Sequence, residues 1–300
     1  MAILRYTLLV DHIVEKMQQQ AVDAGTNRAE IDVSGGIDSA VVAALSCEAF
    51  GPKNVIGVFS SIHSSNASLV KARLVADKFE FKMLELDLSD VYATIVSKVR
   101  TEFERLEITM PEASEKTVYG SLRSCLRAPV GRFINRCFGG GMRQGTGNRD
   151  EDELLRFYQK GGDGEVDCNW IAGLYKSEVW DLARHLGVPS QVISATPTPE
   201  LWGENGQTDE DELADITGVQ LTYRDKDDGG IGTIEWVTRE NDRHGVINKP
   251  ELSPGDLVRY SPKEIEIIIA VRKMERATRH KAQLPPSLDR KKLEYENIVV

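Results

Sequence analysis

The chain has 300 residues, of which 41% are hydrophobic and 28% are charged, values that exclude a disordered, collagen-like or coiled-coil protein. The formal net charge of −10 disfavours a protein that holds nucleic acid by bulk attraction, because neutralising phosphates requires a surplus of lysine and arginine. An anionic ligand would therefore need a local set of donor groups.

Cysteine usage and hydropathy indicate a cytoplasmic protein. The four cysteines form no C-x-x-C pair and have no neighbouring histidine at zinc-ligand spacing, which favours reduced thiols over a disulfide or metal framework. Charged residues interrupt the first 17 positions, unlike a signal peptide. Apolar runs such as Ile267 to Val271 are too short to cross a bilayer. We expect neither a membrane partner nor a nucleic-acid partner.

Predicted strands and helices alternate along the first half of the chain. Residues 3–20 place apolar side chains at three- and four-residue intervals, which predicts an amphipathic helix. The further elements are strands at 30–33, 55–59 and 81–88, a buried helix from Ala40 to a stop at Gly51-Pro52, and helices at 66–79 and 89–106. This alternation predicts a doubly wound, mostly parallel α/β sheet with helices on both faces.

The second half is less regular. It predicts a helix at 117–137 interrupted near Pro129, a helix at 174–186 closed by Gly187, and a final helix at 261–280. Residues 222–260 are rich in charges, with a candidate hairpin that pairs Thr233–Thr238 with Gly245–Asn248. We interpret this stretch as a surface insertion in a single domain that spans 1–300.

The motif Ser34-Gly35-Gly36-Ile37-Asp38-Ser39 lies between a predicted strand and a predicted helix. Two glycines let the backbone approach an anion, and successive N–H groups at a helix start supply a positive field. Asp38 would repel a bare phosphate, so its presence indicates a bridging Mg²⁺. The alternative for a bare S-G-G is a simple tight turn.

This motif resembles the PP-loop of ATP pyrophosphatases, which implies an adenine nucleotide alpha-hydrolase-like fold. Such a loop holds the pyrophosphate that leaves when ATP adenylates a substrate. It matches neither the Walker loop nor the dinucleotide fingerprint.

Further strings narrow the resemblance. They are GTGNRDE at 145–151, KGGDGEVD at 160–167, GLYK at 173–176 and QTDEDEL at 207–213, with Thr198 and His280-Lys281. Together they resemble ammonia-dependent NAD synthetases, in family order and nearly at family spacing, over residues 28–218 and 261–288. Several unrelated strings in register are more specific than any one alone.

The resemblance implies a role for each matching residue. ATP would be bound by Asp32, Val33, Ser34, Gly35, Gly36, Ile37, Asp38, Ser39, Thr146, Lys176 and Thr198. Mg²⁺ would be held by Asp38, Glu151 and Thr198, and deamido-NAD by Arg127, Lys160, Asp167, Glu212, His280 and Lys281. The candidate catalytic residues are Asp38, Lys176 and Asp167, with Asp167 steering or deprotonating ammonium. The implied activity is ATP-dependent amidation of deamido-NAD by ammonia, in a homodimer.

Several assignments have alternatives. Counting forward from Gly145 selects Glu151 as the metal ligand, whereas counting back from Asp163 selects Asp152, and Glu153 is a second fallback. Taken alone, Lys160 and Asp163 are typical solvated loop charges, and a cationic pair such as His280-Lys281 is typical of any helix end. A carboxylate after a glycine-rich turn, such as Asp167, can simply cap a helix.

The chain also departs from the family pattern. Where the family has Gly-Asn-x-x-Ala-Arg-x-Arg, this chain has GSLRSCLR at 120–127, so that Ser121 and Cys125 replace an amide and an arginine while Arg127 is kept. The run GGGMRQ before Gly145 predicts a short or irregular strand. The alternatives are another PP-loop adenylating ligase, an RNA-thiolating enzyme, or a nucleotide-binding homologue that has lost catalysis.

Overall fold

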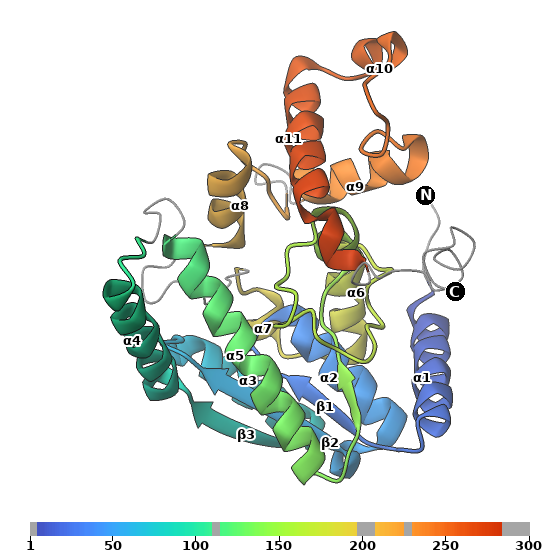
Figure 1. Cartoon of the computed structure of the whole chain (residues 1–300). Coiled ribbons are helices and arrows are strands. Elements are labelled where there is room, and N and C mark those ends of the chain that lie inside the picture. The colour runs from blue at the N-terminus through green and yellow to red at the C-terminus, as the bar shows by residue number, and fades with distance from the viewer. Residues whose placement is uncertain (1–4, 110–114, 197–207, 225–229, 284–300) are drawn as a thin grey trace, which may run out of the picture.

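The structure is a computed structural model that describes residues 5–109, 115–196, 208–224 and 230–283 (Figure 1). Its strands are β1 (Ala29–Asp32), β2 (Val55–Ser61), β3 (Lys82–Asp87) and β4 (Met142–Gln144). Its longer helices are α1 (Tyr6–Asp23), α2 (Ile37–Phe50), α3 (Asn66–Phe79), α4 (Ser89–Arg105), α5 (Glu115–Cys137), α6 (Lys176–Leu186), α8 (Asp209–Thr217), α9 (Thr233–His244) and α11 (Pro262–Thr278). Shorter turns are η1 (Pro52–Asn54), the π-helical η3 (Asp150–Leu155), α7 (Ser190–Ile193), α10 (Pro254–Arg259) and η4 (Arg279–Ala282).

The four described strands form one parallel sheet in the order β3-β2-β1-β4. Asp32 at the end of β1 pairs with Val58 of β2, and Ile31 pairs with Gln144 at the end of β4. The carboxyl ends of the strands therefore meet at one edge, where open α/β sheets bind ligands. The short strand expected before Gly145 is confirmed, since β4 has three residues.

Side chains of β2 alternate between two apolar layers, which confirms the prediction of helices on both faces. Val55 and Phe59 belong to the main core, into which α2 and α3 pack. Ile56 and Val58 belong to a smaller cluster with Ile134 of α5 on the opposite face.

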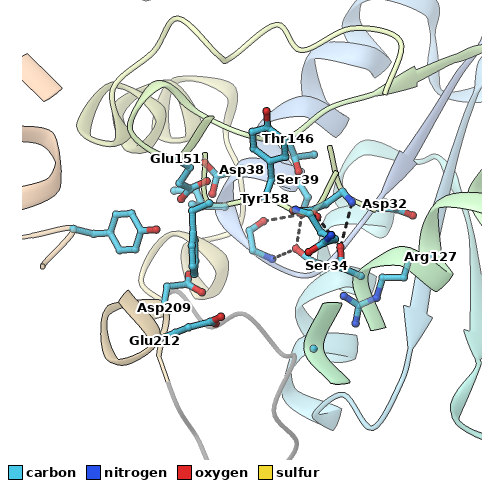
Figure 2. A pocket seen from close by; sticks show the side chains of 18 of the residues that line it. Asp32, Ser34, Asp38, Ser39, Arg127, Thr146, Glu151, Tyr158, Asp209 and Glu212 are labelled. Carbon is cyan, nitrogen blue, oxygen red and sulfur yellow. Dashed lines mark hydrogen bonds between the residues drawn. The ribbon is translucent and has the colours of Figure 1, made fainter. Parts of the chain in front are cut away.

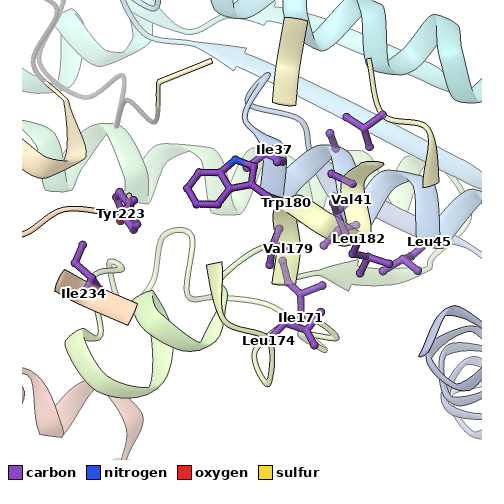
Figure 3. Close-up of a cluster of buried hydrophobic side chains, with 14 of the residues drawn as sticks. Ile37, Val41, Leu45, Ile171, Leu174, Val179, Trp180, Leu182, Tyr223 and Ile234 are labelled. Atoms are coloured by element: carbon purple, nitrogen blue, oxygen red, sulfur yellow. The ribbon is translucent and has the colours of Figure 1, made fainter. Parts of the chain in front are cut away.

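Helix α2 lies at the centre of the main core. Ten of its 14 residues are buried, so it is apolar around most of its circumference, as expected of a helix enclosed by protein. Figure 3 shows Ile37, Val41 and Leu45 of α2 among the side chains that pack with Val179 and Leu182 of α6. Burying a side chain of this size stabilises the fold by about 1.5–3 kcal/mol. This packing joins the helix that begins at Ile37 to the helix that begins at Lys176.

The interruption expected near Pro129 is wrong, because α5 continues from Glu115 to Cys137 with the proline inside it. Proline removes one helical hydrogen bond, but packing against the sheet holds the helix on either side of it. Ala128 and Ile134, on the two sides of Pro129, are both buried.

The hairpin expected within 222–260 is also wrong. Thr233–His244 form helix α9, which ends at Gly245 in a left-handed conformation with φ +62°. Ile234, Val237 and Val246 are fully buried in the main core, so the segment is not confined to the surface. Its buried positions 234, 237 and 238 recur at helical spacing, which short-range alternation concealed.

No helix within the described ranges is long and apolar enough to span a bilayer.

Candidate active site

A cavity of about 520 Å³ opens at the carboxyl edge of the sheet (Figure 2). Residues of the loop after β1 line it together with residues from α5, α6, α8 and α11. Of the ten described residues to which ATP binding was assigned, all but Gly35 are in this lining, beginning with Asp32, Val33, Ser34, Gly36, Ile37, Asp38 and Ser39. Thr146 and Lys176 are in it too, whereas Thr198 lies outside the described residues.

The loop after β1 has the geometry of an anion cradle. Gly35 has φ +83°, and a Cβ there would lie 2.4 Å from the Ser68 carbonyl oxygen, so the turn requires glycine. Gly36 is the N-cap of α2 and has no side chain to cover the first N–H groups of that helix. The Ser39 hydroxyl donates to the Gly36 carbonyl oxygen at 3.0 Å, which braces the turn.

Lys176 joins this loop to the rest of the site. Its Nζ lies 2.7 Å from Asp38 Oδ2 and 2.9 Å from Glu151 Oε1, and its side chain is 2% exposed. Burial disfavours the ammonium, but the two carboxylates outweigh burial and raise the pKa of Lys176 well above its usual value. Asn148 Nδ2 donates to Asp38 Oδ1 at 3.0 Å, which orients the same carboxylate. Lys176 is therefore a permanent cation within this acidic pair.

The two candidates for the metal-binding acid occupy different places. Glu151 lines the cavity and pairs with Lys176. Asp152 is turned away, since its Oδ2 accepts a hydrogen bond of 2.7 Å from Asn169 Nδ2. Burial raises the pKa of Asp152 to about 7, as does the neighbouring Glu151 carboxylate. The geometry favours Glu151.

The residues assigned to Mg²⁺ fit that ion in kind. Asp38 and Glu151 direct hard carboxylate oxygens at one point, where a cationic group already lies between them. Within the described ranges no group of three or more His, Cys, Asp or Glu side chains could hold a metal, so further oxygens would come from phosphate and water. That mixed ligand set is usual for Mg²⁺ at nucleotide sites.

Asp32 contributes a buried carboxylate to the cavity. One oxygen pairs with Arg143 of β4, which also holds Glu30 at 2.7 Å. The other oxygen, Oδ1, is buried and has no hydrogen-bond partner among the described residues. Arg127 also lines the cavity, where its Nε donates to the Ser60 carbonyl oxygen at 3.2 Å.

The structure does not bring Asp167 to the cavity lining. Its Oδ2 lies 2.7 Å from Arg132 Nη1 and accepts a hydrogen bond of 2.7 Å from the Arg143 backbone N–H. Burial would raise the pKa of Asp167, but Arg132 and the backbone hydrogen bond outweigh burial and lower it. A carboxylate so stabilised is a poor proton acceptor, so the geometry does not support the catalytic assignment.

The two lysines assigned to deamido-NAD join the 156–163 loop to residues 280–283. Lys281 Nζ lines the cavity and donates to the carbonyl oxygens of Arg156 at 3.0 Å and Tyr158 at 2.6 Å. Lys160 Nζ donates to the Gln283 carbonyl oxygen at 2.9 Å and, like His280, lies outside the cavity lining.

Two cavity residues were missed as candidates from the sequence. Asp209 begins α8, one turn before the predicted Glu212, and both point into the cavity in Figure 2. Tyr223 is 2% exposed, its ring centroid lies 4.9 Å from Lys176 Nζ, and its hydroxyl has no described hydrogen-bond partner. The acidic string at 207–213 was a signal for Asp209, whereas nothing local distinguished Tyr223.

The residues that depart from the family pattern lie on α5 beside the cavity. Ser121 lines it directly, whereas Cys125 is not in the lining. Ser124, next to Cys125, does line the cavity, and its Oγ donates to Asp163 Oδ1 at 2.6 Å. Asp163 also lines the cavity.

The parallel sheet, the glycine turn and the acid-bridged lysine together define an α/β protein with the PP-loop fold. The family model described as NAD synthase matches residues 9–244, and the chain belongs to that family. It is 38% identical to the NH(3)-dependent NAD(+) synthetase of Methanosarcina acetivorans over 208 residues, which cover 68% of this chain and 75% of that protein. It is 30% identical to the Halobacterium salinarum enzyme of the same name over 282 residues, covering 92% and 91%.

Solved structures agree on the fold. The NMN synthetase of Francisella tularensis superposes with a TM-score of 0.73 at 19% identity, covering 96% of this chain and all of that one. The NH3-dependent NAD synthetase of Campylobacter jejuni gives 0.69 at 17% identity with the same coverage.

Proposed function

We propose that this protein amidates deamido-NAD with ammonia at the expense of ATP, releasing NAD, AMP and pyrophosphate. A nicotinate carboxylate oxygen attacks the α-phosphorus of ATP, and the bond to the bridging oxygen of the leaving pyrophosphate breaks. Ammonia then attacks the acyl carbon of the adenylate, AMP leaves with the electron pair, and one proton is lost from nitrogen. A carboxylate has no good leaving group, and adenylation supplies one.

The observation that carries this proposal is the position of Lys176 between Asp38 and Glu151, beside the glycine turn. A fixed cation next to a row of backbone N–H groups suits a triphosphate, whose charge shifts onto pyrophosphate in the transition state. Lys176 is 2% exposed, so water screens its charge weakly. Asp38 and Glu151 would hold Mg²⁺, which would further neutralise the leaving pyrophosphate.

The substrate carboxylate would approach from the α5 side of the cavity. Arg127 lines that side and can attract an anion, while Lys281 secures the 156–163 wall through the Tyr158 carbonyl oxygen. Lys160 and His280 would support that wall from outside the lining.

We propose that Asp209, in place of Asp167, accepts the proton that the nitrogen loses after ammonia has attacked the adenylate. Burial raises the pKa of Asp209 to about 8, and the nearby charges of Glu151, Glu212 and Asp38 add to the rise while Lys176 opposes it. A carboxylate with this pKa can accept a proton from the attacking nitrogen at mildly alkaline pH. Its place in the cavity lining gives it access to the adenylate.

We further propose a cytoplasmic homodimer that forms over α4. Tyr92 is the one buried residue of this 17-residue helix, while Val91, Val99 and Phe103 are 50%, 47% and 36% exposed. Val99 and Phe103 lie four positions apart and so share one face, and Val91 lies about two turns before Val99. Sedimentation analysis should show a dimer that Val99→Asp and Phe103→Asp together dissociate, and a monomer in the unmutated protein would exclude this assembly.

The activity is tested by incubating purified protein with ATP, Mg²⁺, ammonium and deamido-NAD. Equal amounts of pyrophosphate and NAD are expected. Pyrophosphate release without NAD would indicate another adenylating ligase, and no release with tight ATP binding would indicate a homologue without catalysis. Either outcome would overturn the proposal.

A further inference from the structure

Three carboxylates accept hydrogen bonds from the backbone N–H groups at the start of α6, the helix that carries Lys176. The hydrogen bonds run from Tyr175 N to Glu178 Oε2 at 3.0 Å, from Lys176 N to Asp150 Oδ2 at 2.9 Å, and from Ser177 N to Glu235 Oε2 at 2.9 Å. Free N–H groups at a helix start can bind an anion, but these three are committed to protein acceptors. The start of α6 is therefore an anchor for Lys176 and not a phosphate site.

Two of the anchoring groups come from near the cavity itself. Glu178 belongs to α6, and Asp150 precedes Glu151 in η3. Adjacent residues of η3 thus hold both ends of Lys176, Asp150 through the backbone N–H and Glu151 through Nζ at 2.9 Å.

The third group comes from α9, 58 residues further along the chain. Glu235 is fully buried and accepts from Ser177 twice, through the backbone N–H at 2.9 Å and through Oγ at 2.7 Å. Arg239, one turn later in α9, lies 2.7 Å from Glu235 and balances its charge. A buried carboxylate with these partners holds one geometry, because losing any of them leaves a desolvated polar group.

A second side chain of α9 reaches the same place. Asp242 Oδ2 accepts a hydrogen bond of 3.0 Å from Arg149 Nε and another from the Tyr175 hydroxyl. Arg149 precedes η3 and Tyr175 precedes Lys176, so α9 contacts both segments that position the lysine.

We propose that Glu235 is a positioning residue for the adenylation step and that it acts through Ser177 to hold Lys176 against Asp38 and Glu151. The inference rests on the proposed function, in which Lys176 neutralises the triphosphate. Glu235 lies outside the cavity lining and so has no direct contact with ligand. Its effect should therefore fall on turnover more than on substrate binding.

The test compares three variants in the full-length enzyme: Glu235→Ala, Glu235→Gln and, as a matched control, Arg243→Ala. Arg243 lies on the same helix, where its side chain is 53% exposed and pairs with Glu240 at 2.9 Å, a carboxylate outside the hydrogen bonds that hold Tyr175, Lys176 and Ser177. Steady-state kcat and KM for ATP and for deamido-NAD are measured well below the midpoint of thermal unfolding of each variant. Near-ultraviolet circular dichroism checks that each variant is folded.

Glu235→Ala is expected to lower kcat about 10- to 100-fold, the size of effect produced by small misplacement of a catalytic group. Both KM values should stay within about threefold, since the cradle and the cavity wall are unchanged. Glu235→Gln should recover part of the loss, because its amide oxygen can still accept from the Ser177 N–H. Arg243→Ala should keep kcat within about twofold, because the pair of Arg243 with Glu240 holds neither end of Lys176.

A merely structural role would lower the unfolding temperature of both Glu235 variants and leave kcat of the folded enzyme unchanged, and that result overturns the inference. Equal loss in Glu235→Ala and Glu235→Gln together with a matching rise in KM for ATP also overturns it. If Glu235→Ala does not fold, Ser177→Ala removes one of the two hydrogen bonds and should lower kcat several-fold. An inactive unmutated enzyme would refute the proposed function itself, which separates the two failures.

Discussion

The loop after β1 and helix α9 serve the same site by different means. The loop is built from consecutive residues, and its glycine turn, helix start and Asp38 all lie within Ser34–Ser39. Helix α9 contributes no residue to the cavity lining, yet Glu235 and Asp242 contact the segments that hold Lys176. The comparison shows that the residues that contact a ligand can be neighbours in the sequence. The position of a catalytic side chain such as Lys176 can still depend on residues far away in the chain.

The largest effect is expected from the loop. Asp38→Ala should lower turnover at least about 1000-fold, because it removes one of the two carboxylates that hold Lys176 and the proposed metal. The fold should stay intact, which circular dichroism and the urea midpoint can check. Asp77→Ala, an exposed carboxylate on α3, is the control and should match the unmutated enzyme. Near-normal activity of Asp38→Ala would show that the loop after β1 does not supply a carboxylate that the reaction needs.

Backbone geometry of the same loop gives the next prediction. Gly35→Ala should weaken ATP binding about 10-fold or more, since the new Cβ would lie 2.4 Å from the Ser68 carbonyl oxygen and φ is +83°. Calorimetric titration of ATP measures the change. Gly25→Ala, also at positive φ but with open space around it, is the control for backbone strain alone. Equal effects would show that the cradle tolerates displacement.

The acidic wall supplies a pH-dependent prediction. Since the pKa of Asp209 is raised to about 8, its proton-accepting form increases as pH rises through that value, and so should kcat at constant free ammonia. Asp209→Asn should lose this rise and lower kcat about 100-fold.

The same raised pKa has a stability consequence of opposite sign. The folded protein binds this proton more tightly than the unfolded chain does, whose ordinary pKa is 3.8, so the contribution of Asp209 to stability falls as pH rises from 3.8 towards 8. Asp209→Asn should therefore gain stability relative to the unmutated protein at pH 9 but not at pH 4. A pH-independent difference in the urea midpoint would contradict this assignment.

The smallest effect tests the buried hydroxyl of Tyr223. It has no described partner, so Tyr223→Phe should leave the free energy of unfolding unchanged or raise it by about 1 kcal/mol. Tyr260 is the matched control, since its buried hydroxyl donates to Glu240 at 2.9 Å and Tyr260→Phe should cost about 1 kcal/mol. Equal destabilisation in urea would show that the Tyr223 hydroxyl has a protein partner.

Elements that depend on local sequence were predicted correctly, and elements that depend on packing against distant residues were not. The helix at 66–79 was predicted with the bounds it has, and the strands before and after it were placed within two residues, because hydrophobic period and capping are local signals. The hairpin at Thr233–Thr238 failed because Ile-Glu-Trp-Val satisfies a strand pattern over four residues and a helical one over eight. The break at Pro129 failed because packing of α5 on the sheet outweighs one lost hydrogen bond.

The amino-acid sequence by itself determined the parallel α/β order and the glycine turn that holds Asp38, since these depend on period and backbone freedom. The polar residues further along the chain, such as Lys176 and Glu151, were expected only from the family resemblance. Tertiary structure alone decided that Glu151 and not Asp152 faces Lys176, and that Arg132 forms an ion pair with Asp167. It also brought Tyr223 to Lys176 and Glu235 to the start of α6. The physical reason is that each of these outcomes is set by the direction of a buried side chain towards a group far away in the chain. Such directions are fixed by packing and by competition for hydrogen-bond partners, which no local pattern encodes.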